Sequence, residues 1–119
     1  MNILSLISAV IISVITPVDL PEISGVRDGR AVFVEDQAIV AVIPDAFTSA
    51  DAKNQAMHDA AERLGKEWGK EILLTDDLMT YMSLARMERR GADDYERRHL
   101  AVRLARVRSY SYPKEPVSG

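Results

Sequence analysis

Apolar residues in the middle of the chain first form two short blocks and then recur at helical spacing. Ala31–Glu35 and Ala38–Ile43 are rich in alanine, valine and isoleucine, which predicts two strands joined as a hairpin. Both faces of this pair are apolar, so we expect it to be covered on both sides. Thr48, with Asp51 three residues on, predicts the start of a helix. The apolar stripe of that helix is Met57, Ala61, Leu64 and Trp68.

A strand and a second helix are predicted next. Ile72–Thr75 is a short apolar run, and a strand that returns after a helix is expected to pair with the hairpin through a crossover. Asp76 or Asp77 caps the following helix, Leu78–Arg90. We expect that helix to bury a stripe of Leu78, Met82 and Ala85, and we assign Met79, Met82 and Met87 to the core.

The last predicted helix starts at Asp93 or Asp94 and runs to Val107, with Leu100 and Leu104 on its apolar face. Residues 110–113 end the fold. Together the elements predict a single α+β domain over residues 30–113. It has a small three- to four-stranded sheet in the order hairpin–helix–strand, one long helix packed on the sheet, and two C-terminal helices. The residues expected to hold the core together are Val32, Val34, Ile39, Val40, Leu64, Trp68, Ile72 and Leu74.

Within the N-terminal segment, Met1–Thr16, the run Ile3–Ile15 is apolar except for three serines. It has the length of a signal peptide and is shorter than the roughly 20 residues that span a bilayer. A signal or membrane anchor, a buried strand or helix of the fold, and an interfacial segment all fit it. As a buried strand it would supply the fourth strand of the sheet. Residues 17–29 read as a linker because prolines and glycines interrupt them, and residues 114–119 as a flexible tail.

Charge is distributed unevenly along the 119 residues. Residues 1–85 carry 6 basic and 13 acidic side chains, a net of −7, whereas residues 86–119 carry 9 and 5, a net of +4. The chain contains no cysteine, which excludes disulfides, thiolate metal sites and cysteine nucleophiles.

Several polar residues are candidates for chemistry. His58 and Glu62 have the i,i+4 spacing of two metal ligands, but no further ligand accompanies them. His99 has neither a nucleophile nor an orienting partner nearby in the sequence. The Asp76–Asp77 pair lacks a phosphate-binding glycine loop, and helix capping explains it. The sequence therefore predicts a protein that is not an enzyme, with no cofactor, no metal and no catalytic residue.

Arginine is concentrated near the C-terminus, at positions 86, 89, 90, 97, 98, 103, 106 and 108. Acidic residues lie between these arginines, so we expect local pairing within the helices. Contact with lipid headgroups or with a partner is the functional option, and the residues assigned to it are Arg89, Arg90, Arg97 and Arg98. Nucleic acid is not favoured, because few aromatic residues accompany the arginines.

The order of these motifs resembles the YhcN/YlaJ-type sporulation lipoproteins. AVFVEDQAIVAVIP resembles their paired strands, EILLTDD their third strand, and the helices ending in RVRSYSYP their closing helices. The resemblance covers residues 28–113, and it departs from the family in lacking a lipobox cysteine. It implies a non-catalytic protein at the membrane of a spore-forming bacterium, with a role in spore formation or germination. The same order of elements also resembles BON-type and ring-building envelope domains.

We therefore expect an exported or membrane-associated interaction protein, with a membrane surface or an envelope protein as partner. One alternative is a cytoplasmic homo-oligomer whose N-terminus is a core strand. Another is a small binder of nucleic acid or anions that uses the C-terminal arginines.

Overall fold

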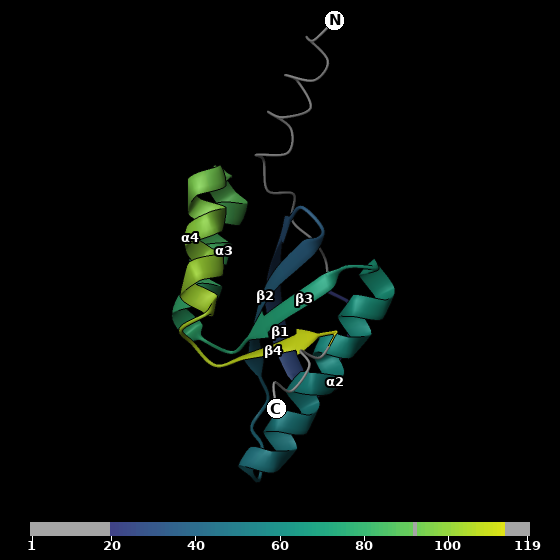
Figure 1. Ribbon diagram of the computed structural model, residues 1–119. Coiled ribbons are helices and arrows are strands. Elements are labelled where there is room, and N and C mark those ends of the chain that lie inside the picture. The colour runs from purple at the N-terminus through teal and green to yellow at the C-terminus, as the bar shows by residue number, and fades with distance from the viewer. Residues whose placement is uncertain (1–19, 92, 114–119) are drawn as a thin grey trace, which may run out of the picture.

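The computed structural model describes residues 20–91 and 93–113, and this part of the chain has an α+β fold (Figure 1). Its four strands form one mixed sheet, and its three helices cover both faces. The strands are β1 (Val26–Val34), β2 (Gln37–Pro44), β3 (Glu71–Thr75) and β4 (Ser109–Tyr112). The helices are α2 (Ala50–Trp68), α3 (Leu78–Arg90) and α4 (Asp94–Leu104).

The sheet has the spatial order β1-β2-β3-β4. β1 and β2 form an antiparallel hairpin closed by a two-residue turn, in which Glu35 has a φ of 57°. β2 and β3 are parallel because α2 carries the chain back across the sheet, and Val40 lies opposite Leu74. β4 pairs antiparallel with β3, so that Tyr110 also lies opposite Leu74.

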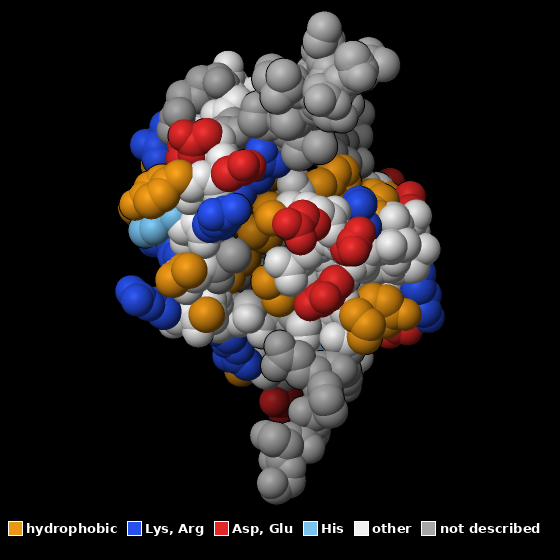
Figure 2. All heavy atoms as spheres, turned by 45° about the horizontal axis from the view of Figure 1, so that its top comes forward, with side chains coloured by type: hydrophobic (Ala, Val, Ile, Leu, Met, Phe, Trp, Pro, Cys, Tyr) orange, Lys and Arg blue, Asp and Glu red, His pale blue; other side chains and the backbone are white. Residues whose placement is uncertain are grey.

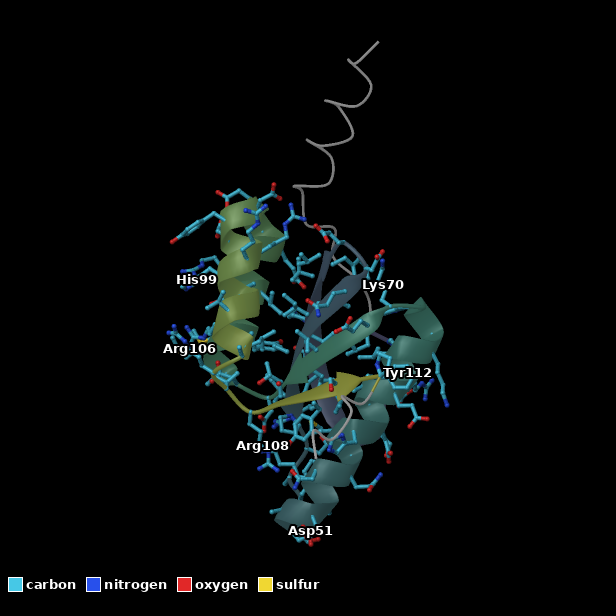
Figure 3. All side chains as sticks on the ribbon, viewed as in Figure 1. Asp51, Lys70, His99, Arg106, Arg108 and Tyr112 are labelled. Carbon is cyan, nitrogen blue, oxygen red and sulfur yellow. The ribbon has the colours of Figure 1, made fainter. Side chains whose placement is uncertain are left out.

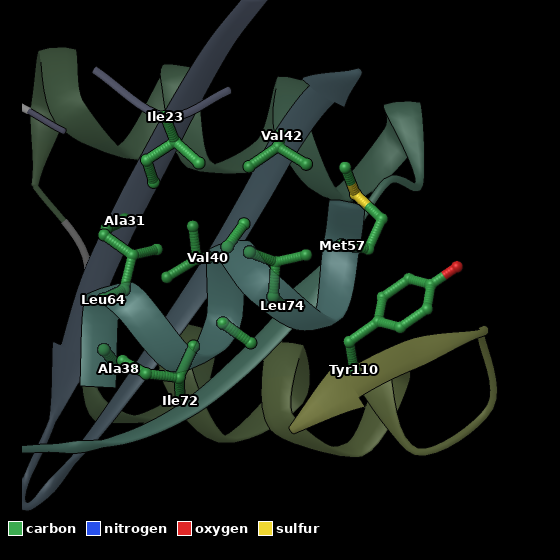
Figure 4. Close-up of a cluster of buried hydrophobic side chains, with 12 residues drawn as sticks. Ile23, Ala31, Ala38, Val40, Val42, Met57, Leu64, Ile72, Leu74 and Tyr110 are labelled. Carbon is green, nitrogen blue, oxygen red and sulfur yellow. The ribbon is translucent and has the colours of Figure 1, made fainter. Parts of the chain in front are cut away.

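Helix α2 covers one face of the sheet (Figure 4). Its inner side presents Met57, Ala60, Ala61 and Leu64, a spacing of i, i+3, i+4 and i+7 that places all four on one side of a helix. They pack against a cluster of buried sheet residues: Ala31, Ala38, Val40, Val42, Ile72, Leu74 and Tyr110. Trp68 is only partly buried at the end of α2, where its ring is perpendicular to that of Phe33 at a centroid distance of 5.4 Å.

Helices α3 and α4 cover the opposite face (Figure 1). Leu84 and Met87 of α3, with Leu100 and Leu104 of α4, pack against a patch of the sheet formed by Val32, Ile39 and Ala41. The two helices are consecutive in the chain, and Arg103 near the end of α4 lies 3.7 Å from Asp77 at the start of α3. The helices are therefore antiparallel. The hairpin is covered on both sides, as its apolar faces predicted.

The predicted α+β class and the four-stranded sheet are confirmed, but some boundaries are wrong. β1 begins at Val26, inside the predicted linker, and Ile23 before it joins the core. The fourth strand is β4, which the sequence analysis treated only as the end of the fold. Residue Ser49 rather than Thr48 caps α2, by accepting a hydrogen bond from the backbone N–H of Ala52. Helix α4 ends at Leu104, before Val107.

The predicted stripe of α3 is also wrong. Leu78 and Met82 are more than half exposed, as is Met79, so the assignment of Met79 and Met82 to the core is wrong. The assignment of Met87 to the core is confirmed, and Thr80 and Leu84 are buried as well. The expectations for residues 1–19 and 114–119 fall outside the described part of the chain, so no N-terminal contribution to the sheet is assigned.

Candidate functional site

The side of α3 that points away from the sheet carries a continuous exposed stripe. Leu78, Met82, Arg86 and Arg89 are all exposed, and their spacing of +4, +4 and +3 keeps them on one side of a helix. Met79 borders this stripe, and its exposed fraction is 56%. The first half of the stripe is apolar and the second half is cationic.

Helix α4 carries a matching stripe beside it. Tyr95, Arg98, His99 and Val102 are exposed and spaced at i, i+3, i+4 and i+7. Tyr95 is 76% exposed, and its ring stacks on that of His99 at a centroid distance of 6.2 Å. Figure 3 shows His99, and Arg106 just beyond the helix, pointing away from the sheet.

Because α3 and α4 cover the same sheet face, their exposed stripes form one surface, here called the outer face. Its residues are Leu78, Met79, Met82, Arg86, Arg89, Tyr95, Arg98, His99, Val102 and Arg106. The antiparallel arrangement places Leu78, Met82, Val102 and Arg106 toward one end and Arg89 and Tyr95 toward the other, with Arg98 near the middle of α4. On the left of Figure 2, where these helices lie, cationic and hydrophobic side chains are exposed, with acidic side chains among them toward the top.

Four guanidinium groups on the outer face are available for contact. Within the described part of the chain, the side chains of Arg86, Arg89, Arg98 and Arg106 make no hydrogen bond or ion pair. The expectation that the arginines pair locally is therefore wrong for these four. An arginine that is exposed and unpaired retains all five N–H donors for a carboxylate or phosphate.

The four arginines assigned to contact from the sequence have different positions. Arg89 and Arg98 lie on the outer face, as expected. Arg97 is 4% exposed and pairs with Asp94 at 3.3 Å, so its assignment to surface contact is wrong. It lies on the inner side of α4, where it flanks the core, because Arg97 and Leu100 are three residues apart. The side chain of Arg90 lies outside the described part.

A polar cluster that the sequence analysis missed joins β1 to α3. The Arg30 guanidinium contacts Asp28 at 2.9 Å and Glu88 at 3.1 Å, and it lies 5.4 Å from the centre of the Tyr81 ring. The Tyr81 hydroxyl donates to Asp28, and this bond holds the pKa of Asp28 below its usual value. Burial raises the pKa of Glu88. These contacts fasten the helix to the sheet, and the buried Nε of Arg30 lies 3.1 Å from Glu88 without making a hydrogen bond.

Nearby, a cavity of about 370 Å³ lies between β1 and the segment that precedes it. Its lining consists of Leu20–Ile23 and Val26–Arg30. The Asp28 and Arg30 side chains in this lining already bond to each other and to Tyr81 or Glu88. The cavity therefore offers a ligand few free polar groups.

The carboxyl end of β3 is followed by the acidic pair Asp76–Asp77. Asp77 caps α3 by accepting hydrogen bonds from the backbone N–H and the hydroxyl of Thr80, and the hydroxyl bond is the main cause of its lowered pKa. Asp76 forms an ion pair with Lys53 of α2. Both carboxylates therefore have structural partners, as the capping interpretation predicted for Asp77.

The histidine candidates are not brought together with other ligands. The rings of His58 and Tyr110 are perpendicular, with their centroids 5.0 Å apart. The Glu62 carboxylate forms an ion pair with the Lys66 ammonium at an N···O distance of 2.7 Å. Among the described residues, no group of three or more histidine, cysteine, aspartate or glutamate side chains could hold a metal ion. In the same residues, no helix is long and apolar enough to cross a membrane.

No protein-family model matches this chain, and neither a curated protein nor a solved structure matches it. The resemblance to the sporulation lipoproteins consequently stays a prediction from the order of motifs.

Proposed function

We propose that this protein is a non-catalytic interaction protein associated with the bacterial envelope, and that the outer face of α3 and α4 is its contact surface. The observation that carries the proposal is the set of four exposed, unpaired arginines, Arg86, Arg89, Arg98 and Arg106, beside large exposed apolar side chains. Exposed apolar residues scattered singly are ordinary on a protein surface, whereas a cluster of them next to free arginines is typical of an interaction site.

The roles of the other polar groups support assigning function to this surface. Arg30 and Glu88 fasten β1 to α3, Asp77 caps α3, and Asp76 pairs with Lys53. These groups are engaged in holding the fold together, whereas the arginines of the outer face hold nothing in place.

The envelope assignment rests on the sequence. An apolar segment, Met1–Thr16, precedes the domain, and the order of motifs resembles that of sporulation and germination proteins of the spore membrane. The charge distribution is compatible with it, because residues 86–113 carry eight arginines and four acidic residues, a net of +4. Bacterial membranes and many envelope polymers are anionic, and a cationic face would orient the domain toward them.

Cysteine footprinting of the full-length protein in bacterial cell fractions tests this proposal. The chain has no cysteine, so Val102→Cys places a single thiol on the outer face and Asp59→Cys places one on α2, on the opposite side of the sheet. We expect the protein in the envelope fraction, with position 102 protected from a water-soluble maleimide and position 59 reactive. After solubilisation, both thiols should react at similar rates.

Two results would contradict the proposal. One is recovery of the protein in the soluble cytoplasmic fraction, which would favour the cytoplasmic homo-oligomer. The other is equal labelling of positions 59 and 102 in the envelope fraction, which would show that the outer face makes no contact there.

A further inference from the structure

The geometry points to an anionic phospholipid bilayer as the partner of the outer face, with its apolar end inserted at the headgroup–acyl boundary and its arginines on lipid phosphates. This inference rests on the proposed function and names the partner of the same surface. It commits to a bilayer, as opposed to a folded protein or a nucleic acid.

The apolar end of the outer face has the features of an inserting surface. Leu78, Met79 and Met82 have exposed fractions of 59%, 56% and 56%, and Val102 of the neighbouring helix has 54%. All four project from helices whose opposite sides are anchored in the core by Leu84 and its neighbours. A rigid pair of helices can therefore lie flat on a membrane and bury these side chains at shallow depth, as interfacial helices do.

The cationic part of the outer face complements this arrangement. Arg86 and Arg89 continue the stripe of Leu78 and Met82 along α3, so they lie on the same side of the helix as the apolar residues. Long arginine side chains reach phosphates at the headgroup level while their aliphatic stems remain among apolar groups. Each basic residue close to an anionic membrane contributes about fivefold to binding at physiological salt.

Three acidic side chains of the same layer bond to groups other than these arginines. Glu88 pairs with Arg30 on the sheet side, and Asp94 pairs with Arg97. Asp93 accepts a hydrogen bond from the backbone N–H of Glu96 at the start of α4.

The shape of the surface separates a bilayer from a protein partner. The outer face is made of two convex helices, and the cavity described above lies along β1 and the segment before it. Protein partners are generally held by anchors that fill pockets. A convex surface with peripheral arginines and flexible methionines suits a deformable layer of headgroups, in which the lipids adapt to the protein.

The test measures the depth of spin labels on vesicles. Met82→Cys and the control Asp59→Cys of the full chain each carry one nitroxide, because no other cysteine is present. The vesicles contain either phosphatidylcholine alone or phosphatidylcholine with phosphatidylglycerol. On anionic vesicles we expect the label at position 82 to become accessible to oxygen and shielded from a water-soluble nickel chelate. The label at position 59 should stay accessible to the chelate.

Paired variants separate the contributions of charged and apolar side chains to the affinity for vesicles. Arg89→Gln with Arg98→Gln should weaken binding to anionic vesicles by about 25-fold at physiological salt, that is about fivefold for each arginine. The matched control, Arg63→Gln with Lys66→Gln, removes the same charge from α2 and should change binding less than about twofold, because those residues face away from the bilayer. Met79→Gln with Met82→Gln should weaken binding by about tenfold, as expected for partial burial of two methionines.

Each outcome bears on a different claim. If the protein binds vesicles while both labels remain in water, insertion is wrong. If the outer face is protected in the cell envelope but the domain does not dock on vesicles, the partner is a protein or polymer, so the lipid inference fails while the proposed function holds. Equal effects of the α2 and outer-face charge variants would show attraction by net charge alone and would overturn the assignment to this face.

Discussion

Gly65 of α2 provides the sharpest test of how the helix packs on the sheet. A Cβ atom added at this position would lie 2.1 Å from Cδ1, 2.7 Å from Cε1 and 3.0 Å from Cγ of the Tyr112 ring. Carbon atoms in ordinary contact are about 3.5–4.0 Å apart, so the ring or the helix has to move. Because Cγ is itself too close, a rotation of the ring does not relieve the overlap.

The two physical effects of Gly65→Ala have opposite signs. Helix propensity favours alanine over glycine by about 1 kcal/mol in a helix interior. Overpacking in a well-filled contact costs about 1–3 kcal/mol. We therefore expect Gly65→Ala to lower the free energy of unfolding by about 1 kcal/mol, although propensity alone predicts a gain.

Urea unfolding followed by the fluorescence of Trp68, the only tryptophan, measures this difference. In a Tyr112→Ala background the overlap is absent, so Gly65→Ala should instead raise the free energy of unfolding by about 0.5–1 kcal/mol. A stabilising effect in the wild-type background would refute the packing of α2 on β4, as would the same effect in both backgrounds.

Three further predictions concern α3 and α4. Asp77→Asn should retain the cap of α3 but remove a pH dependence of stability. The pKa of Asp77 is lowered in the folded state, so the charged carboxylate stabilises the wild-type fold at any pH above the usual pKa of an aspartate. This stability is lost as the pH falls through the pKa that Asp77 has in the folded state. Unfolding curves between pH 6 and about pH 2.5 should therefore fall less steeply for Asp77→Asn than for the wild type. Arg97→Glu should lower the free energy of unfolding by about 3 kcal/mol, because it buries a carboxylate near Asp94. Arg98→Glu should change the free energy of unfolding by less than about 0.5 kcal/mol. Equal losses for the two variants in urea unfolding would contradict the burial of Arg97. Leu84→Ala should cost about 2–5 kcal/mol and Met82→Ala less than about 0.5 kcal/mol in the same assay, and the reverse order would mean that α3 is rotated.

The hairpin, α2 and β3 could be predicted because each has a local pattern that only one structure satisfies. Ala38–Ile43 is apolar on both faces, and both faces are covered. The stripe of Met57 and Leu64 has helical spacing and packs on the sheet. In these segments local preference and tertiary packing favour the same structure, so the sequence alone is enough to predict the secondary structure.

Helix α3 shows why the rest could not be predicted. It has two candidate apolar stripes, one through Leu78 and Met82 and another through Leu84 and Met87, and periodicity alone cannot choose between them. The second stripe is buried together with Thr80, whose hydroxyl is satisfied by Asp77. This bond allows a polar residue into the core, and only the three-dimensional arrangement reveals it.

Only part of the candidate site could be predicted, because composition does not show which side of a helix a residue occupies. Arg89 and Arg98 were assigned to contact from composition, but composition cannot separate them from Arg97, which points inward. β4 was missed because SYSY is short and polar. Its strand conformation comes from pairing with β3, a contact between segments more than thirty residues apart.

The late position of β4 also has a consequence for synthesis of the protein on the ribosome. Tyr110 belongs to the same buried cluster as Met57 and Ile72, and β4 forms one edge of the sheet. Domains are made from the N-terminus onward, so a nascent chain that has emerged only as far as α4 has every helix of the described fold but an open sheet edge along β3. Such an edge can pair with another chain. The emerging domain would therefore be most in need of a chaperone in the short interval before residues 109–112 leave the ribosome.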